Sequence, residues 1–197
     1  MLLVSGWRLV FAGVAWWAIY TGMTPDGALR WTNLFSWSQL STLTVALTAT
    51  GSLLWPLFNG GRLEPRWGIL RGATTTYIVG TLVLFPLLIG GGYDSRASQL
   101  MHLVTPLLAI CDWLFVGRNQ NRLPVWAPFA WLIVPVLYLP AYIYRSTTAR
   151  PPYGFLDPAR DNFATWVAVL IAAFLALGLL VWAVGRARGA LLAAATR

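Results

Sequence analysis

Lysine is absent from this chain, charged residues make up only 10% of it, and histidine and cysteine occur once each. A soluble protein normally carries about 25% charged residues, so the scarcity of charge argues against a soluble domain. The single cysteine, Cys111, excludes an internal disulfide and a metal site built from several cysteines. We interpret Cys111 as a small buried hydrophobic residue.

The single histidine, His102, limits cofactor chemistry in the same way. Haem ligation by two histidines is impossible within one such chain. No cysteine or group of acids accompanies His102 at the spacing of metal ligands. We therefore expect neither a metal nor a cofactor.

In place of charge, the chain is rich in apolar sequence. Hydrophobic residues make up 58% of its 197 residues, and the mean hydropathy is +0.65. A membrane-spanning helix needs about 20 apolar residues, and six such spans are expected at 2–21, 34–58, 69–90, 99–117, 125–145 and 163–185. The sequence thus predicts an all-α integral membrane protein, a bundle of six transmembrane helices in one domain (1–197), in the bacterial inner or plasma membrane. The first run is too long for a signal-peptide core and lacks a small-residue cleavage site, so we interpret it as a retained span.

Arginine supplies all 14 basic residues and a formal net charge of +8. Arginines beside apolar spans follow the positive-inside rule, which explains the excess without a nucleic acid partner. With the N-terminus inside, the cytoplasmic side holds Arg8, Arg62, Arg66, Arg71, Arg118, Arg122, Arg186, Arg188 and Arg197. The other side holds Arg30, Arg96, Arg145, Arg150 and Arg160, together with Asp26, Asp94, Asp157 and Asp161. This asymmetry predicts that both termini are cytoplasmic.

Hydroxyl residues form a stripe on one face of the second span: Ser38, Ser41, Thr44, Thr48 and Ser52. Such residues are common at helix contacts in membranes, where they bond to carbonyls of the preceding turn. We therefore interpret the stripe as a whole as a surface that packs against neighbouring helices. Its outer end, at residues 35–39, is denser in polar groups than packing requires.

Ionisable groups within the fourth span are costly in a membrane and therefore indicate a function or a specific ion pair. His102 and Asp112 are ten residues apart, which is roughly 15 Å of helix, so they cannot act as a pair. We expect Asp112 to pair with Arg71, or alternatively with Arg118. His102 either bonds a neighbour structurally or serves as general base for a hydroxyl nucleophile at the outer end of the second span.

The loop at residues 150–157 is expected on the same side of the membrane as His102. Its prolines and glycine favour a rigid turn. Tyr153 and Phe155 are aromatic residues of the kind that anchor a chain at the membrane–water interface. Two interpretations stay open: a loop re-entering along the membrane surface, and a lid or rim over a substrate site.

Three motifs occur in a fixed order: residues 70–79, the pattern His102-Leu-Val-Thr-Pro106 followed by Asp112-Trp113, and Tyr153-Gly-Phe-Leu-Asp157. Together they resemble the bacterial six-span branch of the androgen-induced membrane protein family, over spans two to six. Members of its animal branch are integral membrane hydrolases that cleave fatty acid esters of hydroxy fatty acids with a threonine nucleophile and a histidine. The resemblance implies that His102 is the family histidine. The ungapped match places Ser38 at the threonine position, whereas a shifted match selects Ser36.

The expected function is an intramembrane hydrolase of lipid esters, a serine/threonine-type esterase. Ser38 would attack the ester carbonyl and His102 would accept its proton, while Gln39, Ser41 or backbone amides hold the oxyanion. The expected partner is a membrane lipid or fatty acyl ester substrate. The alternative is a non-catalytic membrane protein that binds a lipid or small molecule in a cavity lined by the same polar stripes.

Overall fold

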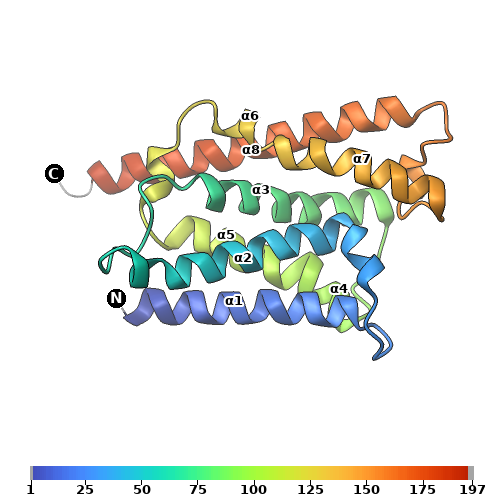
Figure 1. The fold of residues 1–197 in the computed structure, drawn as a ribbon. Helices are drawn as coiled ribbons and strands as arrows, with labels where there is room; N and C mark the ends of the chain where they lie inside the picture. The colour runs from blue at the N-terminus through green and yellow to red at the C-terminus, as the bar shows by residue number, and fades with distance from the viewer. Residues whose placement is uncertain (1, 195–197) are drawn as a thin grey trace.

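Residues 2–194 are described by the computed structural model of the protein. Every regular element in this range is helical (Figure 1). The long helices are α1 (Leu2–Met23), α2 (Trp37–Phe58), α3 (Ile69–Leu84), α5 (Thr105–Phe115), α7 (Ile133–Thr148) and α8 (Phe163–Ala194). The short elements are α4 (Arg96–Gln99), α6 (Ala127–Ala130), the 3-10 helices η1 (Trp31–Phe35), η4 (Asn119–Arg122) and η5 (Gly154–Leu156), and the π-helical turns η2 (Phe85–Ile89) and η3 (Leu100–Val104).

Within the described residues, six helical stretches are long and apolar enough to cross a membrane, so the predicted all-α fold with six candidate spans is confirmed. They are Leu2–Met23, Trp37–Phe58, Ile69–Ile89, Arg96–Phe115, Ala127–Thr148 and Phe163–Leu192. Some helix ends differ from the bounds of the expected spans, because a capping hydrogen bond sets the residue at which the helix begins. Helix α2 begins at Trp37 because the Ser36 hydroxyl accepts the Gln39 N–H at 3.4 Å. Likewise, the fourth stretch begins at Arg96, after Ser95 accepts the Ser98 N–H at 3.0 Å.

Helix α3 lies in the middle of the bundle (Figure 1). It contacts α2, α5 and α8, and half of its span is buried, against 17% for the span of α8. Glycines on α3 allow aromatic rings to approach closely. A Cβ added at Gly72 would lie 2.4 Å from the Trp131 ring, and one at Gly80 would lie 2.5 Å from the Phe174 ring.

Two π-helical turns face each other at the end of the bundle away from the chain termini. Turn η2 contains Pro86, and Pro106 lies two residues after the end of η3, in the first turn of α5. Proline lacks an N–H, so it leaves a carbonyl of the preceding turn without its usual helical partner, and a π turn is one way to change the register. As a result, the Phe85 and His102 rings stack with centroids 3.6 Å apart.

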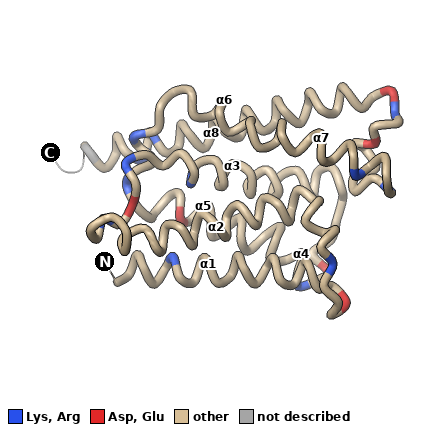
Figure 2. The backbone as a smooth tube through the Cα atoms, in the orientation of Figure 1, with Lys and Arg blue, Asp and Glu red and all other residues tan. Residues whose placement is uncertain are grey.

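The two ends of the bundle differ in charge (Figure 2). The described chain begins and ends at the same end, where arginines outnumber acidic residues, whereas the opposite end mixes both signs. Arg197, which we counted with the first group, lies outside the described residues.

Candidate active site

The structure brings together the two residues that the sequence singled out for chemistry. The Ser38 hydroxyl and His102 Nε2 are 2.9 Å apart, although 64 residues separate them in the chain. Ser38 belongs to the first turn of α2, and His102 lies in the π turn η3. Ser38 is half-buried, and His102 is only 6% exposed.

The hydrogen bonds of His102 assign its tautomer. Nδ1 lies 3.0 Å from the Ser98 carbonyl oxygen and 3.2 Å from the Ser98 hydroxyl. A carbonyl can only accept a hydrogen bond, so Nδ1 carries the proton of the neutral ring. Nε2 is then the acceptor for the Ser38 hydroxyl, which is the arrangement that proton transfer from serine to histidine requires.

The plane of the imidazole is held by the aromatic ring of Phe85. The two rings are nearly parallel, with an interplanar angle of 13°. Phe85 is confined in turn, because a Cβ at Gly91 would lie 2.3 Å from its ring. Sequence reasoning found neither Phe85 nor the Ser98 carbonyl, since both act through the local π-helical geometry.

Ser36, the alternative nucleophile, is engaged in holding the start of α2. Its hydroxyl donates to the Asn33 carbonyl at 2.9 Å and accepts the Gln39 N–H. This arrangement favours Ser38 over Ser36 as the hydroxyl available to His102.

Tyr153 is a further residue at the site, contributed by the loop between α7 and α8. Its hydroxyl oxygen accepts the Trp37 N–H at 2.9 Å and also interacts with the backbone and side chain of Ser38. Burial raises the pKa of Tyr153 to about 12, so the phenol keeps its proton at neutral pH. Because an amide N–H can only donate, the phenol hydrogen stays available as a donor beside Ser38.

The loop that carries Tyr153 is tied to α7. The Tyr142 hydroxyl donates to the Leu156 carbonyl at 2.8 Å, and the Tyr142 and Tyr153 rings stack with centroids 5.9 Å apart. The sequence placed this loop on the same side as His102 and left it open between a surface loop and a substrate rim. The contact with Ser38 favours the rim.

An apolar cavity of about 110 Å³ opens next to Ser38, between α3, η2, α7 and α8. Ser38 and Tyr153 are among its lining residues, and its walls are formed mainly by side chains such as Leu84, Leu139, Leu170 and Phe174. Ser38 therefore borders the cavity while its hydroxyl contacts His102. A cavity of this character suits a hydrocarbon chain.

Two other hydroxyls near the site have structural partners. Ser41 bonds the Thr81 hydroxyl at 2.8 Å, and Thr42 donates to the Ser38 carbonyl at 2.7 Å. The Gln39 side chain packs against α1, where a Cβ at Gly22 would lie 1.9 Å from its Nε2. Neither Gln39 nor Ser41 lines the cavity, so the structure does not favour them as oxyanion donors.

Comparison with known proteins gives no identification. No family model, curated protein or solved structure matches this chain. Among residues 2–194, no three His, Cys, Asp or Glu side chains are grouped as metal ligands would be.

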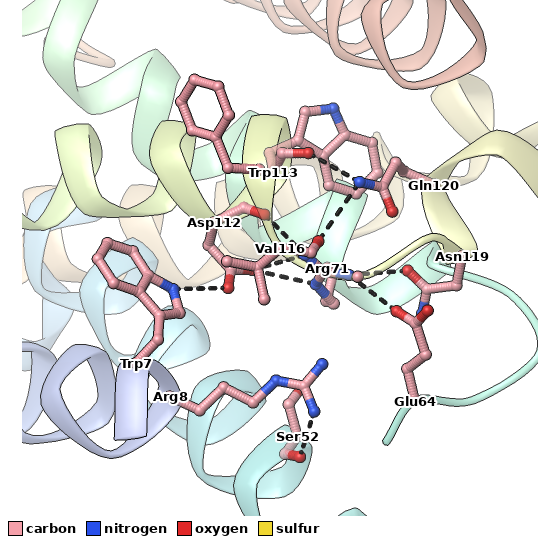
Figure 3. A network of polar contacts seen from close by, with 12 residues as sticks. Trp7, Arg8, Ser52, Glu64, Arg71, Asp112, Trp113, Val116, Asn119 and Gln120 are labelled. Carbon is pink, nitrogen blue, oxygen red and sulfur yellow. Dashed lines mark hydrogen bonds and ion pairs between the residues drawn. The ribbon is translucent and has the colours of Figure 1, made fainter. Parts of the chain in front are cut away.

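A second polar cluster lies at the other end of the bundle (Figure 3). The predicted ion pair is present: Arg71 Nη2 and Nε lie 2.7 and 3.1 Å from Asp112 Oδ2. Arg71 also donates to the carbonyl of Val116 at 2.8 Å and to Asn119 at 2.8 Å, while Trp7 donates to Asp112 Oδ1 at 2.9 Å. This cluster joins α1, α3 and α5, which is the structural role expected of Asp112.

Arg8 extends this cluster to α2, a role that sequence reasoning missed. Its side chain donates to the Ser52 carbonyl at 3.0 Å and to the Leu63 carbonyl. Ser52 lies inside α2, four residues before Pro56, which has no N–H to bond its carbonyl, and Leu63 is in the loop after α2. The buried guanidinium of Arg8 therefore satisfies both backbone acceptors.

Proposed function

We propose that this protein is an intramembrane hydrolase of lipid esters, with Ser38 as nucleophile and His102 as general base. The observation that carries the proposal is the 2.9 Å contact between the Ser38 hydroxyl and His102 Nε2, with Nδ1 bonded to a carbonyl. Hydroxyl nucleophiles are activated by a base whose other side is fixed in this way.

In the proposed reaction, the Ser38 oxygen attacks the ester carbonyl carbon while its proton moves to His102 Nε2. The imidazolium that forms keeps its Nδ1–H bond to the Ser98 carbonyl. It then gives the new proton to the leaving alcohol as the acyl-serine forms. Water, deprotonated by His102, attacks the acyl-serine and releases the fatty acid, and the proton returns to Ser38.

Tyr153 is the oxyanion donor in this mechanism. Its phenol is held beside Ser38 by the Trp37 N–H, and burial keeps it protonated, with a pKa of about 12. A donor that is already in position stabilises the negative charge of the tetrahedral intermediate without reorganisation.

The substrate proposed is a fatty acyl ester that enters from the bilayer, with its acyl chain in the apolar cavity beside Ser38. The excess of arginine at the end with the chain termini supports cytoplasmic termini, which would place the site in the outer leaflet. The motifs around His102 and Tyr153 support membership of the androgen-induced family, whose animal members cleave fatty acid esters of hydroxy fatty acids.

The test compares purified wild-type protein in detergent with Ser38→Ala and His102→Ala. Both variants should lose hydrolysis of chromogenic acyl esters and labelling by a fluorophosphonate probe, by about 10²–10⁴-fold for the histidine. Ser52→Ala is the matched control, because it removes a hydroxyl at the other end of the same helix. Full activity in folded Ser38→Ala or His102→Ala protein would rule out this mechanism.

The cavity also supports the second candidate, a non-catalytic lipid-binding protein. In that case the wild-type protein would co-purify with lipid and show neither hydrolysis nor probe labelling. Ser38→Ala would then retain the lipid, since the apolar walls of the cavity stay intact.

A further inference from the structure

A charged cleft lies at the end of the bundle opposite the candidate active site. It is formed by the loop between α2 and α3 and the segment around η4, and its volume is about 480 Å³. We call it the arginine cleft and define it by Arg62, Glu64, Arg66, Arg118, Asn119 and Arg122. Figure 2 shows arginines gathered at this end of the tube.

The four arginines of the cleft are exposed and form no ion pair with an acidic residue among residues 2–194. The ion pairs of the described residues use Arg30, Arg71 and Arg160 instead. Arginines at the opposite end, by contrast, include two that pair with neighbouring aspartates. The positive charge of the cleft is therefore uncompensated within the described chain.

Glu64 is the single carboxylate that lines the cleft, and both of its oxygens are already bonded. Oε1 accepts the Arg118 backbone N–H at 2.6 Å, and Oε2 lies 3.4 Å from Arg71 Nη1. Glu64 thus lines the cleft but forms no ion pair with any of the four exposed guanidinium groups.

The cleft lies beside helices that are long and apolar enough to cross a membrane. It is next to the ends of three apolar stretches, which end or begin at Phe58, Ile69 and Phe115. Large aromatic side chains near it are exposed: Phe115 by 74%, Trp126 by 52% and Trp67 by 49%. Exposed tryptophans beside the ends of spans are typical of the membrane interface.

We propose that the arginine cleft binds the phosphate group of an anionic phospholipid headgroup. Guanidinium groups bind phosphate oxygens through paired N–H donors, and basic pockets at the ends of spans bind such headgroups. The proposal is independent of the esterase, because it concerns the other end of the bundle. Free phosphate has the same binding chemistry, so the experiment has separate arms for the two sources.

The experiment measures phospholipid bound to the purified full chain by native mass spectrometry. The chain is reconstituted with phosphatidylcholine alone or with added phosphatidylglycerol. Wild type should retain phosphatidylglycerol, and the variant with Arg62→Gln, Arg66→Gln, Arg118→Gln and Arg122→Gln should bind it about a thousandfold more weakly. The matched control carries Arg96→Gln, Arg145→Gln and Arg150→Gln at the opposite end and should bind like wild type.

Inorganic phosphate titrated into the lipid-free protein forms the second arm. Phosphate binding that the four cleft substitutions abolish would support the phosphate site and assign free phosphate as a ligand. Equal loss of phosphatidylglycerol in the cleft variant and the control, or equal retention in the cleft variant and wild type, would overturn the proposal. The single variants Arg62→Gln and Arg122→Gln decide the matter if the fourfold variant does not fold, because both side chains are exposed.

Discussion

Replacing Tyr153 with phenylalanine removes one hydroxyl group from the candidate active site and keeps the ring. The ring contacts should survive, because Tyr142 and Phe155 stack on it at centroid distances of 5.9 and 6.0 Å. The variant loses the 2.9 Å hydrogen bond from the Trp37 N–H. A buried donor without a partner costs about 1–3 kcal/mol, so the variant should fold with a moderately lower Tm.

The loss of catalysis should exceed the loss of stability. Removing one oxyanion donor lowers kcat by about 10²–10³-fold, or about 2.7–4 kcal/mol. KM should change little, because the phenol is expected to bond the oxyanion more strongly than the ester carbonyl of the bound substrate. The assay is steady-state hydrolysis of a chromogenic acyl ester, with a melting curve of the same preparation.

Tyr144→Phe is the matched control, since Tyr144 is on α7 and 70% exposed. An unchanged kcat in Tyr153→Phe, alongside an inactive His102→Ala, would refute the oxyanion role and leave the esterase intact. A replacement of Tyr153 by 3-fluorotyrosine separates chemistry from packing, because it makes the phenol more acidic and nearly preserves its shape. A purely structural hydroxyl would leave kcat unmoved by this change.

Three further predictions concern pH, stability and substrate choice. Activity should fall at acid pH, because a protonated His102 cannot accept the proton of Ser38. The raised pKa of Tyr153, about 12, predicts that activity is not lost at alkaline pH up to about pH 10. A pH–rate profile in which activity falls with rising pH near neutrality would contradict this. Asp112→Ala should destabilise the protein by about 3–5 kcal/mol in detergent unfolding, because the buried guanidinium of Arg71 loses its carboxylate partner. Arg71→Asp combined with Asp112→Arg should recover part of the expression lost in either single variant, because it restores the opposite charges but not the bonds of Arg71 to Val116 and Asn119; no recovery at all would argue against the ion pair. Gly80→Ala should push the Phe174 ring, 2.5 Å from the added Cβ, toward the cavity and shift hydrolysis to shorter acyl chains; an unchanged chain-length preference would place the acyl chain elsewhere.

The architecture was predictable because it depends on local properties of the chain. Apolar runs of about 20 residues require helices in a membrane, since every backbone N–H and C=O must find a partner within the segment. The ends of those helices were less predictable. The start of α2 at Trp37 depends on the Ser36 cap, which competes with an apolar stretch that begins earlier in the sequence.

The ion pair between Arg71 and Asp112 could also be predicted. An unpaired charge within a span is costly, so two opposite charges at the same depth of two spans are expected to pair. The additional partners of that pair come from α1 and two loops, including Trp7, Glu64 and Asn119. Nothing in the local sequence indicates that these segments converge. Only the packing of the bundle brings them together.

By itself, the sequence determined that the chain forms six apolar helices, and that Ser38 and His102 were the residues to consider for hydroxyl chemistry. Residue type and hydrophobic period are enough for the helices and for His102 beside a hydroxyl of the second span, whereas the choice of Ser38 came from the resemblance to a family. The tertiary structure decided the rest: the rotation of α2 against η3 that places a hydroxyl 2.9 Å from Nε2, the Ser98 carbonyl that assigns the tautomer, and the loop that brings Tyr153 to the start of α2. These features depend on how helices turn about their axes and where π turns change the register, and that is set by contacts between segments far apart in the chain.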